Sequence, residues 1–187
     1  MRRAPQRGQA LAEVAVLLPL MLILFLGSWT AADLIADNNT VLQATRAGAR
    51  YAAELGNNGS PTDSNLSDAQ AADALIIEQV LPVVSKLTNA QVVEIDIYGC
   101  SNGGVFTPAC TTNGAYIAGE PVDRYDGSGS PTALPWANPY TLNLRDQVHP
   151  DESDLGVMVT FRYTSPSLAM FSQSDVQYTI MRLAPVE

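Results

Sequence analysis

The feature that most constrains this chain is an uninterrupted apolar segment close to its N-terminus. Residues 14–32 contain no charged side chain, and their apolar residues do not gather on one stripe. A buried core helix is usually apolar on one side only. As a helix that rises about 1.5 Å per residue, the segment spans about 28 Å, close to the thickness of a bilayer's hydrocarbon core. It therefore predicts a single membrane-spanning helix.

Charge on the two sides of this segment predicts its orientation. Three arginines precede it, namely Arg2, Arg3 and Arg7. The next basic residue is Arg46. By the positive-inside rule, the N-terminus is cytoplasmic and the chain after about Asp33 lies outside the cytoplasmic membrane. A secretory signal peptide is the main alternative, because residues 30–32 (Thr-Ala-Ala) form a weak cleavage site.

Composition narrows the classes of function. From Gln9 onward, seven basic residues face nineteen acidic ones, a net charge of −12. Nucleic-acid phosphates repel a body this acidic, so we expect no nucleic-acid partner. The chain holds one histidine, His149, and two cysteines, which leaves few groups for catalysis or for zinc. We expect no enzymatic activity, no catalytic residue, no cofactor and no metal site.

A carboxylate borders the membrane segment in a specific context. The sequence reads Gly8-Gln9-Ala10-Leu11-Ala12-Glu13. A cut after Gly8 would make Gln9 the first residue and Glu13 the fifth. A short basic leader, a glycine, a cut, a glutamate at position five and an apolar helix together form the class III signal of type IV prepilins.

The surrounding residues resemble one family in particular. Residues 7–13 (RGQALAE) and 17–20 (LLPL) are similar to the opening of TadE-like proteins, the minor pseudopilins of the tight-adherence (Tad/Flp) pilus system. Residues 45–53 resemble the family's second recognisable stretch, and residues 178–182 resemble its closing strand. Val14 departs from the tyrosine that major pilins of this system tend to carry, which favours a minor subunit.

The resemblance implies a structural role in assembling a Tad-type surface pilus for adhesion or secretion. A prepilin peptidase would cut between Gly8 and Gln9, and other pilin and pseudopilin subunits in the cytoplasmic membrane would be partners. Glu13 would neutralise the new amine of Gln9 on a neighbouring subunit. Pro19 is either a tolerated membrane proline or a hinge. The alternative is an uncleaved, single-pass anchor that carries an extracytoplasmic binding domain.

The chain after the membrane segment predicts an α+β fold. The first helix should run over residues 9–56, with small residues on one stripe (Thr45, Gly48, Ala49 and Ala52), and end at a left-handed Gly56. Residues 1–8 are the leader, and residues 57–187 form the extracytoplasmic domain. A second, short helix should start near Ser67, which has capping-box spacing to Gln70, and Pro82 should end or kink it.

Three segments alternate with a period of two and predict a three-stranded antiparallel sheet with one covered face. Their apolar members are Val93, Ile95 and Ile97, then Val157, Val159, Phe161 and Tyr163, then Val176, Tyr178 and Ile180. Between them, residues 99–155 are rich in glycine and proline and predict a long loop insertion.

The predicted loop holds the remaining candidate residues. Cys100 and Cys110 would form a disulfide outside the cytoplasm, with two free buried thiols as the alternative. The residues between Asp123 and Ser130 faintly resemble a calcium loop but lack its spacing, so a turn is preferred. Three aromatic residues are expected to pack the loop onto the sheet rather than form a contact surface: Tyr125, Trp136 and Tyr140.

Overall fold

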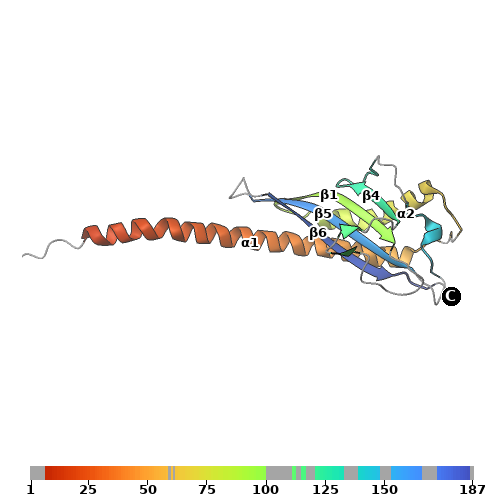
Figure 1. Ribbon diagram of the computed structural model, residues 1–187, viewed down its shortest axis with the longest axis horizontal. Helices are drawn as coiled ribbons and strands as arrows, with labels where there is room; N and C mark the ends of the chain where they lie inside the picture. The colour runs from red at the N-terminus through yellow and green to blue at the C-terminus, as the bar shows by residue number, and fades with distance from the viewer. Residues whose placement is uncertain are drawn as a thin grey trace, which may run out of the picture.

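The computed structural model describes residues 7–58, 60, 62–99, 111–112, 115–116, 121–132, 139–147, 153–165 and 172–185. For residues 7–12, 111–112 and 115–116 it describes the backbone alone. One helix, α1 (Arg7–Leu55), runs most of the length of the molecule, and only its C-terminal half packs on the remainder of the chain (Figure 1). The N-terminal half projects away from that body as a rod.

A second helix and a four-stranded antiparallel sheet complete the fold. Helix α2 (Leu66–Val84) precedes the first strand, β1 (Ala90–Gly99). The other strands of the sheet are β4 (Val122–Asp126), β5 (Asp154–Thr164) and β6 (Ser172–Arg182). The strands lie in the order β4-β1-β5-β6. A separate pair joins β2 (Thr111–Thr112) to β3 (Ala115–Tyr116), and a short 3₁₀ helix, η2, covers Leu142–Leu144. The predicted α+β class is confirmed.

The predicted count of three strands is wrong, because β4 lies inside the predicted loop 99–155. This strand pairs with β1 from Glu94↔Asp126 to Tyr98↔Val122. It is only five residues long and stands between Pro121 and Pro131, two residues that typically mark a loop. An edge strand tolerates prolines at its ends because one side of it needs no ladder hydrogen bonds.

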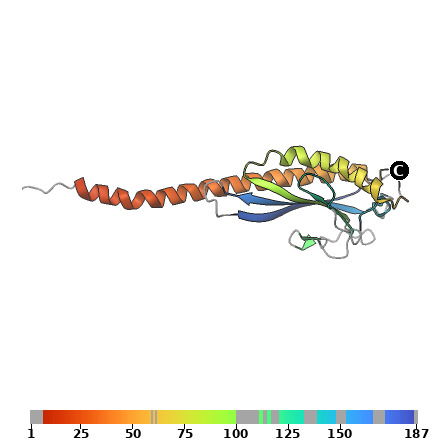
Figure 2. The ribbon, with the colours of Figure 1, turned by 90° about the horizontal axis from the view of Figure 1, so that it is seen from above.

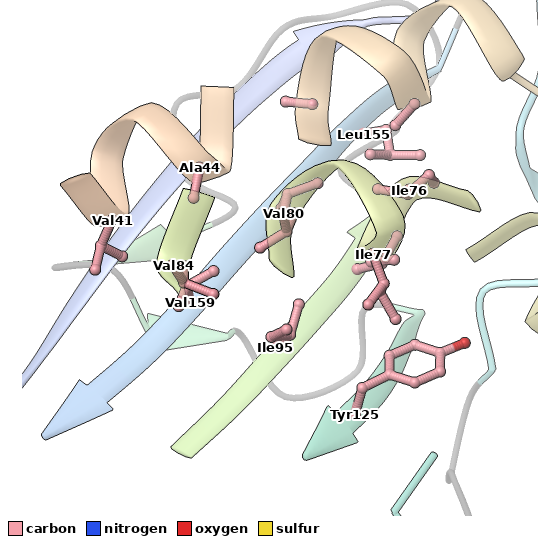
Figure 3. Packing of buried hydrophobic residues seen from close by; sticks show 14 of the residues in the cluster. Val41, Ala44, Ile76, Ile77, Val80, Val84, Ile95, Tyr125, Leu155 and Val159 are labelled. Atoms are coloured by element: carbon pink, nitrogen blue, oxygen red, sulfur yellow. The ribbon is translucent and has the colours of Figure 1, made fainter. Parts of the chain in front are cut away.

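Both helices cover the same face of the sheet (Figure 2). Between the layers lie buried aliphatic side chains from α1, α2 and the central strands, among them Val41, Ile76, Val80, Ile95 and Val159 (Figure 3). The small-residue stripe of α1 is confirmed, because its four members are all buried. A Cβ atom on Gly48 would lie 2.7 Å from Val80 Cγ2, so this glycine lets the two helices approach closely.

The helix ends are partly as expected. Helix α1 ends at Leu55 and Gly56 adopts a φ of +52°, which confirms the predicted left-handed cap. The predicted cap of α2 is wrong, because Asn65 rather than Ser67 is the N-cap, and its side chain accepts a hydrogen bond from the Ser67 amide. Pro82 lies inside α2, which ends two residues later.

In two strands, some apolar side chains do not lie on the covered face of the sheet where the sequence predicts them. A register shift in β1 between Val92 and Glu94 leaves Val93 exposed, although Ile95 and Ile97 are buried under the helices. On β6, Val176 and Ile180 pack with Met158 on the sheet face opposite the helices. The helix-facing side of β6 is mostly polar: Thr179 forms a 2.9 Å hydrogen bond with Thr45 of α1, whereas Met181 packs against the core.

Candidate functional site: the exposed half of the N-terminal helix

Helix α1 carries every residue that the sequence assigns to processing and assembly. Gly8 and Gln9 lie in the first turn of the helix, and Glu13 follows with its side chain exposed. Pro19 lies within the same helix, which continues through it without a break. The structure thus places Gly8, Gln9, Glu13 and Pro19 in one continuous element, and it does not by itself test their roles.

The apolar side chains of this element have no protein core to enter. Every side chain from Val14 to Trp29 is exposed, with Met21 at 69% and Val16 at 74%. Burial of this much apolar surface normally stabilises a fold, so an exposed rod of this kind requires another apolar environment. The described part of α1 is long and apolar enough to cross a membrane. These observations favour a membrane-anchored protein and rule out the alternative of a buried core helix.

Contact between α1 and the rest of the fold begins near the end of the apolar segment. Among the side chains of α1 that the structure describes, from Glu13 onward, Thr30 is the first that is buried. Its hydroxyl lies 3.4 Å from Ser165 Oγ, and the Tyr163 hydroxyl donates to its carbonyl oxygen at 3.4 Å. The end of β5 therefore meets α1 just beyond the apolar rod, which marks the boundary between the two halves of the helix.

Two carboxylates of α1 hold the connection between α2 and β1. Asp37 is 4% exposed and accepts hydrogen bonds from the backbone amides of Thr88 and Asn89, at 3.3 and 3.2 Å. One turn earlier, Asp33 accepts from Asn89 Nδ2 at 3.2 Å. Through these three hydrogen bonds the two aspartates connect α1 to the segment that leads into β1.

A second group of charged residues is buried far from the rod. Arg145 is fully buried, and its Nη2 atom contacts Asp73 Oδ1 at 2.5 Å, Asp123 Oδ2 at 3.4 Å and the Tyr140 carbonyl oxygen at 3.0 Å. The Tyr125 hydroxyl donates to the other Asp73 oxygen at 2.8 Å. This buried charge cluster ties α2, β4 and the segment around η2 together.

The electrostatics of the cluster follow from its burial. Loss of solvent, and then the charge of Asp73, raises the pKa of Asp123 to about 8. On the opposite face of the sheet, burial raises the pKa of Asp96 to about 6, although Arg124 Nε lies 3.0 Å from this carboxylate. Since Arg145, Asp73 and Asp123 have no exposed side-chain surface, the cluster serves to hold the fold rather than to bind a ligand.

Sequence reasoning did not find this cluster, although one signal was available. Asp73 lies on the buried face of α2, between Ala72 and Ile76, where the helical period places apolar side chains. A charged residue at such a position needs a buried partner of opposite charge. Nothing in the sequence around Arg145 identifies it as that partner.

The other candidates in the predicted loop divide into two groups. Asp126 Oδ1 accepts hydrogen bonds from the amides of Ser128 and Ser130, so the preferred turn is confirmed there. Tyr125 and Tyr140 are 2% and 0% exposed and both belong to the main core, so the expected packing is confirmed, although Tyr125 lies on strand β4 of the sheet rather than on a loop. The remaining candidates lie outside the described residues: Cys100, Cys110, Trp136 and His149.

Comparison with known protein families gives one match, and it lies on the N-terminal helix. The sequence model of the TadE-like protein family matches residues 8–50, and this confirms the predicted resemblance over that stretch. The matched segment includes Gly8, Glu13, the whole apolar rod and most of the packed half of α1. No curated protein and no solved structure gives a match. The family match indicates a pilin-like protein associated with the Tad pilus, a class that is typically structural.

Proposed function

We propose that this chain is a minor pseudopilin that a prepilin peptidase cuts between Gly8 and Gln9 and that then takes part in assembling a Tad-type surface pilus. Before processing, the protein spans the cytoplasmic membrane once, with a cytoplasmic N-terminus and the domain of residues 57–187 outside. The observation that carries the proposal is the combination of the family match over residues 8–50 with an apolar rod that no part of the fold covers.

The division of α1 into two halves supports this role. The rod from Val14 to Trp29 leaves its apolar surface available to lipid before assembly and to other subunits afterwards. The half from Thr30 onward is held against the sheet through buried contacts. A domain held this firmly moves with its rod, so packing of the rods determines where each domain lies in the assembly.

The role proposed for Glu13 follows from charge and position. Cleavage after Gly8 creates an ammonium group on Gln9, four residues and thus about 6 Å along the helix from Glu13. In an assembly of parallel rods, Glu13 of one subunit neutralises the amine of its neighbour. Removing one partner of a buried ion pair costs about 3–5 kcal/mol, so the pair selects the correct register between subunits.

Replacing Glu13 with alanine tests this proposal. We expect Glu13→Ala to be cleaved like the wild type, because the peptide bond after Gly8 is unchanged, and to be absent from sheared pili. Immunoblots of membrane and pilus fractions measure both steps. Glu78→Ala is the matched control, because Glu78 is an exposed carboxylate on α2. Normal incorporation of Glu13→Ala into pili would refute the role of Glu13.

A further inference from the structure

Strand β4 covers only part of β1. The pairing between these two strands begins at Glu94, whereas the pairing between β1 and β5 begins at Ala90. Within the described part of the chain, residues 90–93 therefore have a neighbouring strand on one side only. A register shift lies at the end of this segment, and the side chain of Val93 is 45% exposed there. A central strand of the sheet thus has an open edge at its start.

The backbone at this edge directs hydrogen-bonding groups outward. The Thr164 amide donates to the Asn89 carbonyl oxygen at 2.8 Å, so this carbonyl faces β5. Because a planar trans peptide directs its C=O and N–H groups to opposite sides, the amide of Ala90 faces away from β5. These groups alternate along an antiparallel strand, so the Ala90 carbonyl and the Val92 amide face away as well. None of the three forms a backbone hydrogen bond to another described residue.

A groove follows the open edge. It has a volume of about 500 Å³, and its walls come from the end of α2, the start of β1 and the turn after β4. Leu81, Val84 and Leu87 provide its apolar wall. The groove stops at Gly127, where a Cβ atom would lie 2.1 Å from the Val92 carbonyl oxygen, so the turn packs directly on β1 at that end.

An extended peptide matches both walls of this groove. The outward amides and carbonyl of β1 pair with the backbone of an added strand, and aliphatic side chains of that strand cover the apolar wall. A lipid chain would also cover the apolar wall. It would leave the amides of Ala90 and Val92 without acceptors, however, and a buried amide without an acceptor is destabilising.

The rim of the groove is basic, although the chain from Gln9 onward has a net charge of −12. Lys86 lies between two residues that line the groove, and Arg162 stands opposite Gln91 in the register of β1 and β5. Both cations are exposed, and neither forms an ion pair with a described residue. Glu94, farther along β1, already has a cationic partner, because Arg124 Nε lies 3.3 Å from its carboxylate. The charges beside the groove therefore favour an acidic occupant.

We propose that this groove binds an extended segment of a partner protein, which adds to β1 as an antiparallel strand in line with β4 and carries an acidic residue between two aliphatic ones. The aliphatic residues lie opposite Val92 and Ala90, which pack against the core on the helix side, and so they face the end of α2. The inference goes beyond the proposed function and does not depend on cleavage after Gly8.

The acidic residue of the partner lies opposite Gln91 and points to the other face of the sheet, on the side of Arg162. Successive residues of a strand point to opposite faces, and directly opposed residues share a face. Neighbouring strands are about 4.8 Å apart, so the acidic residue and Arg162 stand about 10 Å apart across β1. An arginine and a glutamate that both extend along the sheet bridge this separation.

A short peptide of the stated pattern tests the proposal. The probe is Ser-Thr-Val-Glu-Val-Thr-Ser, titrated into the isotope-labelled full chain in detergent micelles, and the nuclear magnetic resonance shifts of single amides report where it binds. We expect the amides of Ala90 and Val92 to shift. A control peptide with lysine in place of glutamate should bind about fivefold more weakly, because it brings a like charge toward Arg162.

Two variants separate the backbone contact from the charge contact. Ala90→Pro removes the outward amide at the first residue of the strand, where proline is tolerated, and should weaken binding of the glutamate peptide about tenfold. Ala90→Gly keeps that amide and is the matched control. Arg162→Glu should reverse the preference between the two peptides, whereas Arg46→Glu, at an exposed position of α1, should leave it unchanged. Near-ultraviolet circular dichroism checks that each variant is folded.

Several results would overturn the proposal. The groove does not bind such a segment if the glutamate peptide leaves the Ala90 and Val92 amides unshifted, or if Ala90→Pro binds it as tightly as Ala90→Gly does. An Arg162→Glu variant that keeps the wild-type preference contradicts an acidic occupant. If the same amides shift with protein concentration alone, a second copy fills the groove, and if they shift only with added phospholipid bicelles, a lipid does. Intact mass measures cleavage after Gly8 separately, so failure here leaves the proposed function standing.

Discussion

Replacing Asp123 with asparagine tests whether the buried charge cluster controls the stability of the folded domain. Asp123 is fully buried on β4 and accepts a hydrogen bond from the Tyr140 amide at 2.8 Å. Burial raises its pKa from an ordinary value of 3.8 to about 8. The folded protein therefore keeps a proton on Asp123 that the unfolded chain releases. It follows that the free energy of unfolding falls as the pH rises from about 4 to about 8.

The size of the effect follows from the width of this pH window. Each pH unit within it changes the free energy of unfolding by about 1.4 kcal/mol for one proton. Asp96, whose pKa is about 6, contributes in the same direction but mainly below that pH. We therefore expect the free energy of unfolding of the wild type to fall by about 2 kcal/mol between pH 6 and pH 8, because Asp123 loses its proton. The amide that Asp123→Asn introduces does not titrate, while its oxygen still accepts from the Tyr140 amide.

Denaturant unfolding of the full chain in detergent micelles measures this difference. The near-ultraviolet circular dichroism of the buried tyrosines reports on the folded domain at pH 6 and at pH 8. We expect Asp123→Asn to lose most of the wild type's pH dependence in this range. Glu78→Gln, which neutralises an exposed carboxylate on α2, should retain it. A wild type that is equally stable at both pH values, or a variant with the same dependence, would refute the reasoning.

Three further predictions concern packing, charge and the cysteines. Gly48→Leu should lower the stability measured by thermal unfolding by about 1–3 kcal/mol, because even a Cβ atom there would crowd α2. Gly27→Leu is the control and should leave the stability of the domain unchanged, because a Cβ atom at Gly27 has nothing within 4 Å. Asp73→Ala should lower the denaturation midpoint by the equivalent of about 3–5 kcal/mol, because it leaves a buried guanidinium without its nearest carboxylate; a loss below about 1 kcal/mol would contradict this. Alkylation without reductant should add no mass at Cys100 and Cys110, and two adducts would show free thiols.

The sequence was sufficient to predict α1 because its signals are local. A charge-free segment, a basic leader and a glycine cap each depend only on neighbouring residues. The helix runs through the whole charge-free segment and ends at Leu55, one residue before the Gly56 cap. The small-residue stripe that includes Gly48 also follows the helical period, so its burial was predictable. The partner that it packs against, Val80 of α2, was not, because contacts between distant segments leave no local pattern.

The errors occur where tertiary contacts override local pattern. Strand β4 was missed because pairing with β1 stabilises five residues that the flanking prolines mark as loop. The apolar residues of β6 were assigned to the wrong face, since both faces of this sheet bury apolar side chains around β5. The cluster of Asp73, Asp123 and Arg145 was missed because charged residues in a sequence normally indicate solvent exposure.

The N-terminal residue of the protein purified from its native cells tests the central claim most directly. Intact-mass measurement together with N-terminal sequencing distinguishes the alternatives without any variant. Our account predicts a chain that begins at Gln9, with the eight-residue leader removed by the peptidase. A chain that still begins at Met1 would contradict it and favour an uncleaved membrane anchor, and one that begins at Asp33 would show a secretory signal peptide instead.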